Sequence, residues 1–354
     1  MSWEMNILKI TIVGAGAIGG VIGAQLARKG RHVELVDIAQ EHVHAINRNG
    51  LRIKTQDDDY TVSIKAFTPD QLLDKNEGIQ CVLLCVKAQH TKASIKPLLP
   101  LMNEDSFVVS IQNGLCEIDI QEVVGKERTI GGFVNIFADY LEPSIISYGG
   151  KGALSIGEMD GRITPRIKKL EKELSVLDKI VISENVLGYL WAKLAYGAML
   201  TATALTNETI ADVYDNYKYR LMLMNLAGEV LKVADYLGIQ TVAFDDWDPA
   251  DAYPIETRDI EKMHAQLDIH VERLRGYSKV WSGIWRDIVV RKRKTEKPYH
   301  FIPIFKVADE AGIEMPLIKL LLKLLEEVEQ HKRPLTKENL EILLERNNEL
   351  YSAI

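Results

Sequence analysis

The feature that most constrains this chain is a glycine-rich turn between a short apolar run and a helical pattern. Residues 10–13 (Ile-Thr-Ile-Val) have the composition of a buried strand, and a Gly-x-Gly-x-x-Gly pattern follows directly. The first glycine permits a tight turn, the second lets the backbone approach a pyrophosphate, and the third lets the next helix pack closely on the strand. The start of that helix adds free N–H groups that favour phosphate. The predicted phosphate loop consists of Gly14, Ala15, Gly16, Ala17, Ile18 and Gly19.

A second predicted strand, residues 32–37, ends in Asp37, 18 residues after Gly19. A carboxylate at that point can accept hydrogen bonds from ribose hydroxyls. Strand, turn, helix, strand and acid together predict a Rossmann dinucleotide site. The alternatives are a glycine turn without a ligand, or a related fold that binds FAD or S-adenosylmethionine. For Asp37 itself, the alternative is that it caps a helix beginning near Gln40.

The same aspartate predicts the choice of cofactor. Asp37 repels the 2′-phosphate of NADP(H), and the residues after it, Ile38, Ala39 and Gln40, carry no positive charge. Arg31 lies at the opposite end of the strand. NAD(H) is therefore the expected cofactor, and NADP(H) is the alternative.

Two further strands are predicted at residues 79–86 and 107–112, where the sequence is almost continuously apolar. Such runs are typical of parallel strands that are covered on both faces. Lys87, Gln112 and Asn113 stand at the carboxyl ends, and ligands of open α/β sheets bind outside that edge. We therefore expect these three side chains at the cofactor crevice. For Asn113 and the glycine after it, the alternative is an ordinary turn.

The composition limits the organisation and the partners. A length of 354 residues favours two domains, and 47% hydrophobic residues is ordinary for a globular protein. The formal net charge of −7 argues against nucleic acid as a partner. Cys81 and Cys85 lie in an apolar run, which favours buried packing over a metal site. No signal-peptide pattern opens the chain and no run is apolar enough to span a bilayer, so we expect a cytoplasmic protein without a membrane partner or a metal.

The strand pattern stops after residues 180–182, and only helical periods follow. They cover residues 187–205, 219–237, 262–274, 301–311, 317–329 and 337–348. We therefore predict an α/β Rossmann dinucleotide-binding domain over residues 1–183, followed by an all-α C-terminal domain over residues 184–354. A catalytic cleft between them is expected, because ligand sites form preferentially at domain interfaces.

One lysine stands out in the first of these helices. Lys193 is embedded among Leu190, Trp191, Leu194 and Ala195. Burial disfavours a charged ammonium group and makes it a usable general acid. The alternative is a lysine whose stem lies on apolar surface while its ammonium group stays in water.

Six stretches of the chain resemble, in the same order, the ketopantoate reductase family, also called 2-dehydropantoate 2-reductases. They are Gly14-Ala-Gly-Ala-Ile-Gly-Gly, Cys85-Val-Lys-Ala88, Gln112-Asn-Gly114, Ser155-Ile-Gly-Glu158, Leu190-Trp-Ala-Lys-Leu194 and Arg293-Lys-Thr-Glu296. The resemblance implies a Rossmann domain, a helical domain and an active site between them. It implies that Lys87 and Asn113 border the nicotinamide cofactor. It also implies that Lys193 is the general acid that protonates the carbonyl oxygen, and that Glu296 contacts the cofactor side of the site.

The chain departs from the family's usual pattern on the substrate side. The asparagines usual four and eight residues after the lysine are replaced by Gly197 and Thr201, and a usual pair of serines is reduced to Ser282. The acidic segment 244–259 looks like an addition, and this Trp247-containing segment is a candidate to close over a substrate larger than ketopantoate. The family also usually has a basic residue where this chain has an aspartate. The expected substrate-binding residues are Asn113, Lys193, Thr201 and Ser282.

These observations predict an oxidoreductase that moves hydride between NAD(H) and a small oxo or hydroxy acid other than ketopantoate. One alternative is an authentic NADPH-dependent 2-dehydropantoate 2-reductase, and another is a non-catalytic sensor of NAD(P). The leucine-rich run at residues 317–325 has more apolar surface than one helical face needs, and relatives with this domain order are often dimers. We therefore expect a homodimer, with burial of the run in the domain core as the alternative.

Overall fold

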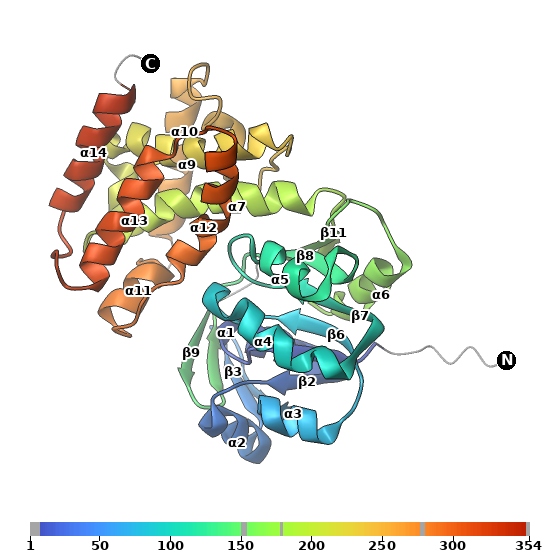
Figure 1. Cartoon of the computed structure of the whole chain (residues 1–354). Helices are drawn as coiled ribbons and strands as arrows, with labels where there is room; N and C mark the ends of the chain where they lie inside the picture. Colours follow the sequence, from blue (N-terminus) through green and yellow to red (C-terminus); the bar gives the residue numbers. More distant parts are fainter. Residues whose placement is uncertain (1–7, 150–153, 178–179, 277–279, 352–354) are drawn as a thin grey trace. The chain divides into compact units, whose positions relative to one another are not determined.

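The computed structural model describes residues 8–149, 154–177, 180–276 and 280–351. The chain forms two compact units, Met1–Val186 and Leu187–Ile354. The sequence predicts the division at 183/184, three residues earlier. Figure 1 shows the elements of both units.

The N-terminal unit is built on an eight-stranded, mostly parallel sheet. Its strands are β1 (Ile10–Val13), β2 (Val33–Val36), β5 (Lys65–Phe67), β6 (Ile79–Leu84), β7 (Met102–Ser110), β8 (Thr129–Val134), β11 (Leu154–Glu158) and β12 (Ile180–Ile182). Their order is β12-β11-β8-β7-β6-β1-β2-β5, and only β8 and β11 pair antiparallel. The predicted α/β class is confirmed.

Helices cover both faces of this sheet, as a parallel sheet requires. They are α1 (Ala17–Arg28), α2 (Gln40–Asn49), α3 (Pro69–Lys75), η1 (Ala88–His90), α4 (Thr91–Ile95), η2 (Lys96–Leu101), α5 (Cys116–Val124), η3 (Lys126–Arg128) and α6 (Pro165–Leu174). Alternate residues of β6 enter two different hydrophobic cores, Cys81 and Leu83 on one side and Val82 and Leu84 on the other. Apolar residues of α1 and α6 belong to the first core, and those of α3, α4 and α5 to the second (Figure 1).

A smaller sheet packs on the α1 side of the N-terminal unit. It has the order β4-β3-β10-β9, and its strands are β3 (Leu51–Lys54), β4 (Asp59–Val62), β9 (Ala138–Glu142) and β10 (Ile145–Tyr148). Ile53 and Ile146 from it lie in the same core as α1. The alternating sequence of residues 60–65 predicts one strand, but β4 ends at Val62 and β5 begins at Lys65 in the other sheet. The apolar segment 129–137 also predicts a strand, of which β8 ends at Val134. The start of a further predicted strand, 152–157, lies outside the described residues.

The described residues of the C-terminal unit form helices and connecting loops without a strand, as predicted; Phe244 and Trp247 make one isolated β-bridge. Its elements are α7 (Val186–Thr203), α8 (Ile210–Asp215), α9 (Tyr217–Tyr236), η4 (Pro249–Asp251), α10 (Ile260–Arg275), α11 (Gly283–Val289), α12 (Lys297–Glu310), α13 (Pro316–Glu329) and α14 (Glu338–Tyr351). The long helix α9 is the centre of the unit, because it contacts α8, α10, α12, α13 and α14. None of the helices in the described ranges is long and apolar enough to cross a membrane.

Candidate active site

The glycine loop between β1 and α1 has the geometry that a pyrophosphate needs. Gly14 has φ +96°, and a Cβ atom there would lie 2.9 Å from backbone atoms of Cys85 and Val86. A Cβ atom at Gly19 would lie 2.0 Å from the carbonyl oxygen of Gly14, so α1 packs directly on the turn. A Cβ atom at Gly16 would meet no atom within 4 Å. The face of the loop at Gly16 is therefore open to a ligand.

Asp37 ties this loop to the end of β2. Its Oδ2 accepts a hydrogen bond from the Ala15 N–H (2.8 Å) and its Oδ1 accepts one from the Ala39 N–H (2.9 Å). The N-cap position of α2 is occupied by Ala39, which makes no side-chain cap. Asp37 is therefore not the N-cap residue of α2, although its carboxylate accepts a hydrogen bond from the N–H of the residue in that position. Its contact with a ribose stays a prediction. The carboxylate is half-buried beside the loop, where a ribose would have to lie.

A histidine that the sequence analysis passed over also holds the loop. His42 is buried on α2, and its Nδ1 accepts a hydrogen bond from the Ser144 N–H (3.0 Å). Its Nε2 therefore carries the hydrogen and donates to the Ala15 carbonyl oxygen (2.9 Å). Both backbone polar groups of Ala15 are thus fixed by side chains. The available signal was a histidine on the apolar face of an amphipathic helix, together with Val43 and Ile46.

The residues after β6 and β7 lie at the same sheet edge as the glycine loop. Val13 pairs with Leu84, and Leu84 pairs with Ser110, so the three strands end in register. Lys87 follows β6 and is half-buried, and the Asn113 side chain is exposed beyond β7. The shared edge predicted for these residues is therefore present.

Gln112 has a structural task at this edge. Its side chain is buried, and its Nε2 donates to the Val86 carbonyl oxygen and to Thr91 Oγ1, both at 2.9 Å. Gln112 thereby joins the loops that follow β6 and β7. Its Oε1 has no hydrogen-bond partner among the described residues, which leaves an acceptor beside the predicted cofactor site.

In the helical unit, Lys193 is half-buried on α7 between side chains that are almost fully buried. Trp191 and Leu194 are each 3% exposed. The predicted apolar surroundings of the lysine are therefore present.

The start of α12 packs against α7 one helical turn after Lys193. A Cβ atom at Gly197 would lie 3.6 Å from Nζ of Lys297, which is 8% exposed. That Nζ lies 3.3 Å from Nδ1 of His300, and Nε2 of the same histidine lies 3.7 Å from Oε2 of Glu296. The start of α12, which carries Glu296, thus approaches the α7 face of Lys193 through Lys297. Lys297 and His300 were not among the residues that the sequence pointed to.

Two predicted substrate residues make local contacts instead. Thr201 is fully buried, and its hydroxyl donates to the Gly197 carbonyl oxygen of its own helix (2.6 Å). Ser282 is 4% exposed and caps α11, where its Oγ accepts a hydrogen bond from the Trp285 N–H (3.2 Å). The described contacts place neither hydroxyl against Lys193 or Glu296. Their roles in substrate binding remain predictions.

The acidic segment after α9 braces α7. Trp247 is 2% exposed, and its Nε1 donates to the carbonyl oxygen of Ala192, next to Lys193 (3.1 Å). Oδ2 of Asp246 lies 2.9 Å from Nδ1 of His270, and Nε2 of that histidine is hydrogen-bonded to the Tyr196 hydroxyl (2.7 Å). Trp247 is therefore a buried support of α7, and closure of the 244–259 segment over a substrate stays a prediction.

The pKa values of two groups in the contact between this segment and α7, Asp246 and Tyr196, shift in opposite directions. Burial alone would raise the pKa of Asp246, but the hydrogen bond from His270 and the charges of His270 and Arg273 bring the pKa below its ordinary value. Burial raises the pKa of the Tyr196 hydroxyl. At neutral pH, Asp246 is therefore an ionised carboxylate and Tyr196 a neutral phenol.

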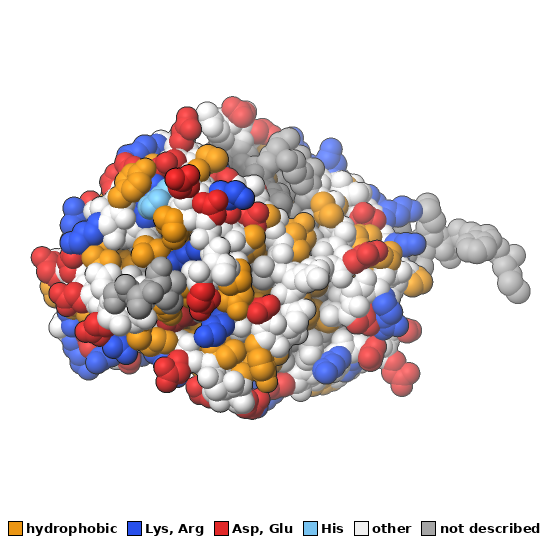
Figure 2. Space-filling model, turned by 90° about the horizontal axis from the view of Figure 1, so that it is seen from above, with side chains coloured by type: hydrophobic (Ala, Val, Ile, Leu, Met, Phe, Trp, Pro, Cys, Tyr) orange, Lys and Arg blue, Asp and Glu red, His pale blue; other side chains and the backbone are white. Residues whose placement is uncertain are grey.

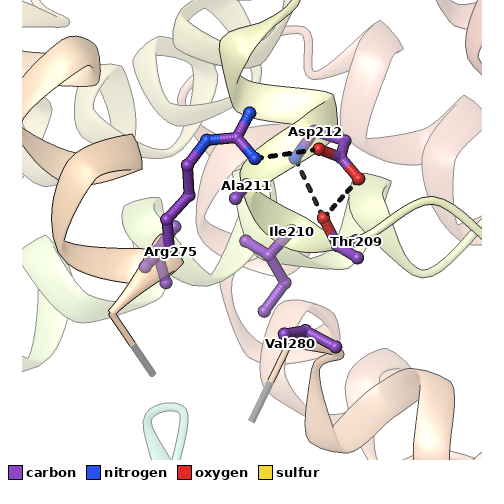
Figure 3. A pocket seen from close by; sticks show the side chains of 7 residues that line it. Thr209, Ile210, Ala211, Asp212, Arg275 and Val280 are labelled. Carbon is purple, nitrogen blue, oxygen red and sulfur yellow. Dashed lines mark hydrogen bonds and ion pairs between the residues drawn. The ribbon is translucent and has the colours of Figure 1, made fainter. Parts of the chain in front are cut away.

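A separate pocket of about 230 Å³ lies between α8 and the end of α10 (Figure 3). It is lined by Thr209, Ile210, Ala211, Asp212, Leu274, Arg275 and Val280. Arg275 reaches across to Asp212 at 3.3 Å. None of the lining residues is among the predicted site residues.

The cysteines are located as expected for packing. Cys81 and Cys116 are buried, and burial raises the pKa of the Cys81 and Cys85 thiols. Across residues 8–149, 154–177, 180–276 and 280–351, no group of three or more His, Cys, Asp or Glu side chains is arranged to hold a metal ion.

Comparison with known proteins gives matches over both units. The family profile described as "Ketopantoate reductase PanE/ApbA" matches residues 10–161, and "Ketopantoate reductase PanE/ApbA C terminal" matches residues 185–329. The 2-dehydropantoate 2-reductase of Pyrococcus abyssi is 29% identical over 318 residues, which cover 89% of this chain and 95% of the relative.

Two solved structures illustrate the likeness of fold. D-mandelate dehydrogenase, in a ternary structure with NADH and anilino(oxo)acetate, has a TM-score of 0.78 at 21% identity and covers 92% of this chain and 99% of its own. The dimeric ketopantoate reductase of Staphylococcus aureus has a TM-score of 0.69 at 18% identity and covers 92% and 100%.

Proposed function

Because this chain belongs to the ketopantoate reductase family, and is therefore an NAD(P)-dependent oxidoreductase acting on CH–OH or C=O groups, we propose that it moves hydride between NAD(H) and a small oxo or hydroxy acid. The observation that carries the proposal is the lysine on an apolar helix, with Glu296 held beside the same helix face. A protein that only senses the cofactor has no need of a proton donor.

The residues of the N-terminal unit fit a nicotinamide dinucleotide. The open face at Gly16 and the start of α1 suit a pyrophosphate, because unpaired N–H groups and the helix dipole favour anions. In this proposal the Asp37 carboxylate accepts hydrogen bonds from the ribose hydroxyls; its position beside the glycine loop supports this role. Lys87, Gln112 and Asn113 follow at the same edge, on the side where the nicotinamide ring belongs. When bound, the cofactor supplies or accepts the hydride.

The side chains of the chain itself handle the proton and the orientation. Lys193 donates a proton to the carbonyl oxygen during reduction and stabilises the negative charge that develops there. In the oxidative direction the neutral amine takes the proton back. Asn113 and Ser282 orient the substrate, and Glu296 borders the cofactor side.

The proposal is tested first by removing the lysine. Lys193→Ala should lower kcat by about 10²-fold or more, the usual size of an acid–base contribution. The exposed Lys323 on α13 provides the matched control, and Lys323→Ala should leave kcat unchanged. Steady-state kinetics and NADH binding are measured on the same preparations. If Lys193→Ala turns over like the unaltered protein, the role given to this residue is wrong.

We infer a substrate other than ketopantoate, since Gly197, Thr201 and the single Ser282 change the substrate side of the site. A panel of 2- and 3-hydroxy acids with NAD, and of their oxo forms with NADH, is read at the nicotinamide absorbance band. The best substrate should exceed ketopantoate clearly in kcat/KM. Comparable activity on ketopantoate with NADPH would identify an authentic 2-dehydropantoate 2-reductase instead, the activity named for the Pyrococcus relative.

We also propose a homodimer, for which the dimeric Staphylococcus aureus relative is the support. The leucine-rich run at residues 317–325 gives less support for a dimer interface than expected, because Leu317, Leu321 and Leu324 are buried within the helical unit. Apolar side chains do remain exposed among charged ones on the surface (Figure 2), such as Ile269 at 59% and Ile302 at 55%. Light scattering at micromolar concentration should give twice the 39.9 kDa of one chain. A mass near 39.9 kDa would count against the dimer.

A further inference from the structure

We propose that Lys297 is a second cation of the substrate site, which binds the carboxylate of a 2-oxo acid while Lys193 acts on the adjacent carbonyl. The inference rests on the proposed function and adds to it a specificity residue. Its basis is the place of one buried ammonium group on the face of α7 that carries Lys193.

The position of Lys297 depends on a missing side chain. Its Nζ lies 3.6 Å from where a Cβ atom at Gly197 would be, which is ordinary van der Waals contact. Any side chain longer than alanine at position 197 would extend into the space of the ammonium group. Gly197 therefore leaves part of the α7 face uncovered, and the positively charged ammonium group of Lys297 lies against that part.

The place lies next to the proposed proton donor. Residues four apart in a helix lie one above the other on one face, with Cβ atoms roughly 5–6 Å apart. Lys193 and Gly197 have this spacing, so the ammonium group of Lys297 stands about one turn from Lys193. A small 2-oxo acid whose carbonyl oxygen contacts Lys193 would therefore have its carboxylate on the same helix face, on the side of Lys297.

His300 orients the ammonium group. An ammonium group only donates hydrogen bonds, so Nδ1 of His300, at 3.3 Å, accepts from Lys297. The ring hydrogen is then on Nε2, which faces Oε2 of Glu296 at 3.7 Å. His300 is 1% exposed, so the ring has little freedom to turn away. Glu296 and Lys297 are thus linked through one histidine at the start of α12.

Burial strengthens the interaction that we infer. Lys297 is 8% exposed, and a charge pair in such surroundings is screened less than one in water. The N-terminal turn of α12, where Lys297 is the first residue, adds a partial positive charge. A carboxylate is therefore favoured at this position over a neutral group of the same size.

The test compares an acid with its neutral analogue. The best 2-oxo acid of the panel and its primary amide are assayed with Lys297→Met and Lys297→Gln, which keep much of the side chain and remove the charge. The ratio of kcat/KM for the acid to that for the amide should fall about 10- to 100-fold, mainly through KM for the acid. Because both substrates are assayed on one preparation, the ratio is insensitive to a loss of folded protein. Lys297→Arg should restore part of the selectivity.

A binding measurement provides a readout that does not depend on turnover. Oxamate, an unreactive analogue of a 2-oxo acid, is titrated calorimetrically into the protein with NADH, and its Kd should rise at least tenfold in Lys297→Met. Lys319→Met, at an exposed lysine of α13, is the matched control and should change neither the ratio nor the Kd. An unchanged ratio in both neutral variants overturns the inference alone. If the unaltered protein turns over no oxo or hydroxy acid, both this inference and the proposed function are overturned.

Discussion

At the scale of single residues, the predicted site residues differ in how many hydrogen bonds their side chains already make within the protein. Asp37 uses one carboxylate oxygen for the loop and one for the start of α2, yet each oxygen can accept a second hydrogen bond. It can therefore bind ribose hydroxyls without releasing the loop. A 2′-phosphate has only acceptors to offer and would meet the carboxylate with charge of the same sign.

This contrast predicts a preference for NAD(H). Repulsion between partly exposed charges about 4 Å apart costs about 1–4 kcal/mol at an effective dielectric of about 20, which is roughly a tenfold to thousandfold preference. Neighbouring residues offer no compensation, since Ile38 is 79% exposed and uncharged. Comparison of kcat/KM for NAD(H) and NADP(H) measures the preference, and Asp37→Asn should narrow it. Equal values in the unaltered protein would show that Asp37 has been misinterpreted.

The sequence predicts such residues only where a backbone motif places them. Asp37 follows a recognisable strand, and Lys193 interrupts an apolar helix, so both could be singled out. His42 contacts Ser144, and Lys297 contacts Gly197. In each pair the two residues are more than 90 positions apart, so no local sequence pattern predicts the contact. Lys297 was also missed because the helix was expected to begin at Phe301. Pro298 in its first turn, a common start signal, indicated the earlier beginning.

At the scale of elements, the β1–α1 turn contains glycines that are required for two different reasons, packing within the protein and space for a ligand. At Gly19 the reason lies in the protein, since a Cβ atom would lie 2.0 Å from the Gly14 carbonyl oxygen. At Gly16 the surroundings are empty, and φ is −66°, which any residue adopts. The second glycine is therefore required only by something that approaches the loop from outside.

Two alanine variants should therefore behave differently. Gly16→Ala should keep the melting temperature within about 2 °C and weaken NADH binding at least tenfold, because the new methyl group occupies ligand space. Gly19→Ala should lower the stability by several kcal/mol, as overpacked sites do. Calorimetric melting and NADH fluorescence titration measure both properties. Unchanged NADH affinity in Gly16→Ala would contradict a pyrophosphate at this loop.

The elements themselves were predictable to different degrees. The buried parallel strands could be predicted from apolar runs, and the longer helices from helical periodicity. The run at residues 60–65 alternates like one strand, but it supplies β4 to the small sheet and leads into β5 in the large one. Which sheet a strand joins is decided by distant partners, Arg52 for Thr61 and Glu34 for Lys65, and not by its own pattern.

At the scale of the whole molecule, the change from strands to helices near Ser183 was visible in the sequence, because a period of two gives way to one of 3.6. What holds the helical unit together was not visible. Its central helix α9 buries Glu229 at 1% exposure, and the carboxylate accepts hydrogen bonds from the N–H groups of Leu317 (2.9 Å) and Ile318 (3.0 Å). An acid on α9 thus caps the start of α13, some 88 residues later in the chain.

This cap predicts how stability depends on pH. Burial raises the pKa of Glu229 from an ordinary 4.5 to about 7, although the N–H groups of Ile318 and Leu317 and the Tyr351 hydroxyl act in the opposite direction. The folded protein therefore keeps its proton where the unfolded chain has lost it. Since the folded state binds more protons between about pH 4.5 and 7, the free energy of unfolding should fall as the pH rises through that window. The contribution of this one group is at most about 3 kcal/mol.

Glu229→Gln removes the titration and isolates this contribution. Urea unfolding of both proteins at pH 4.5 to 8 should show the unaltered protein losing stability relative to the variant as the pH rises to about 7, with a constant difference above it. The variant is expected to be the less stable protein at pH 4.5, because an amide has only one oxygen for the two N–H groups of α13. Glu310→Gln, at an exposed acid of α12, should show no such trend. A difference between Glu229→Gln and the unaltered protein that stays constant across the whole range would mean that folding does not raise the pKa of Glu229, and that its hydrogen bonds offset the effect of burial at this site.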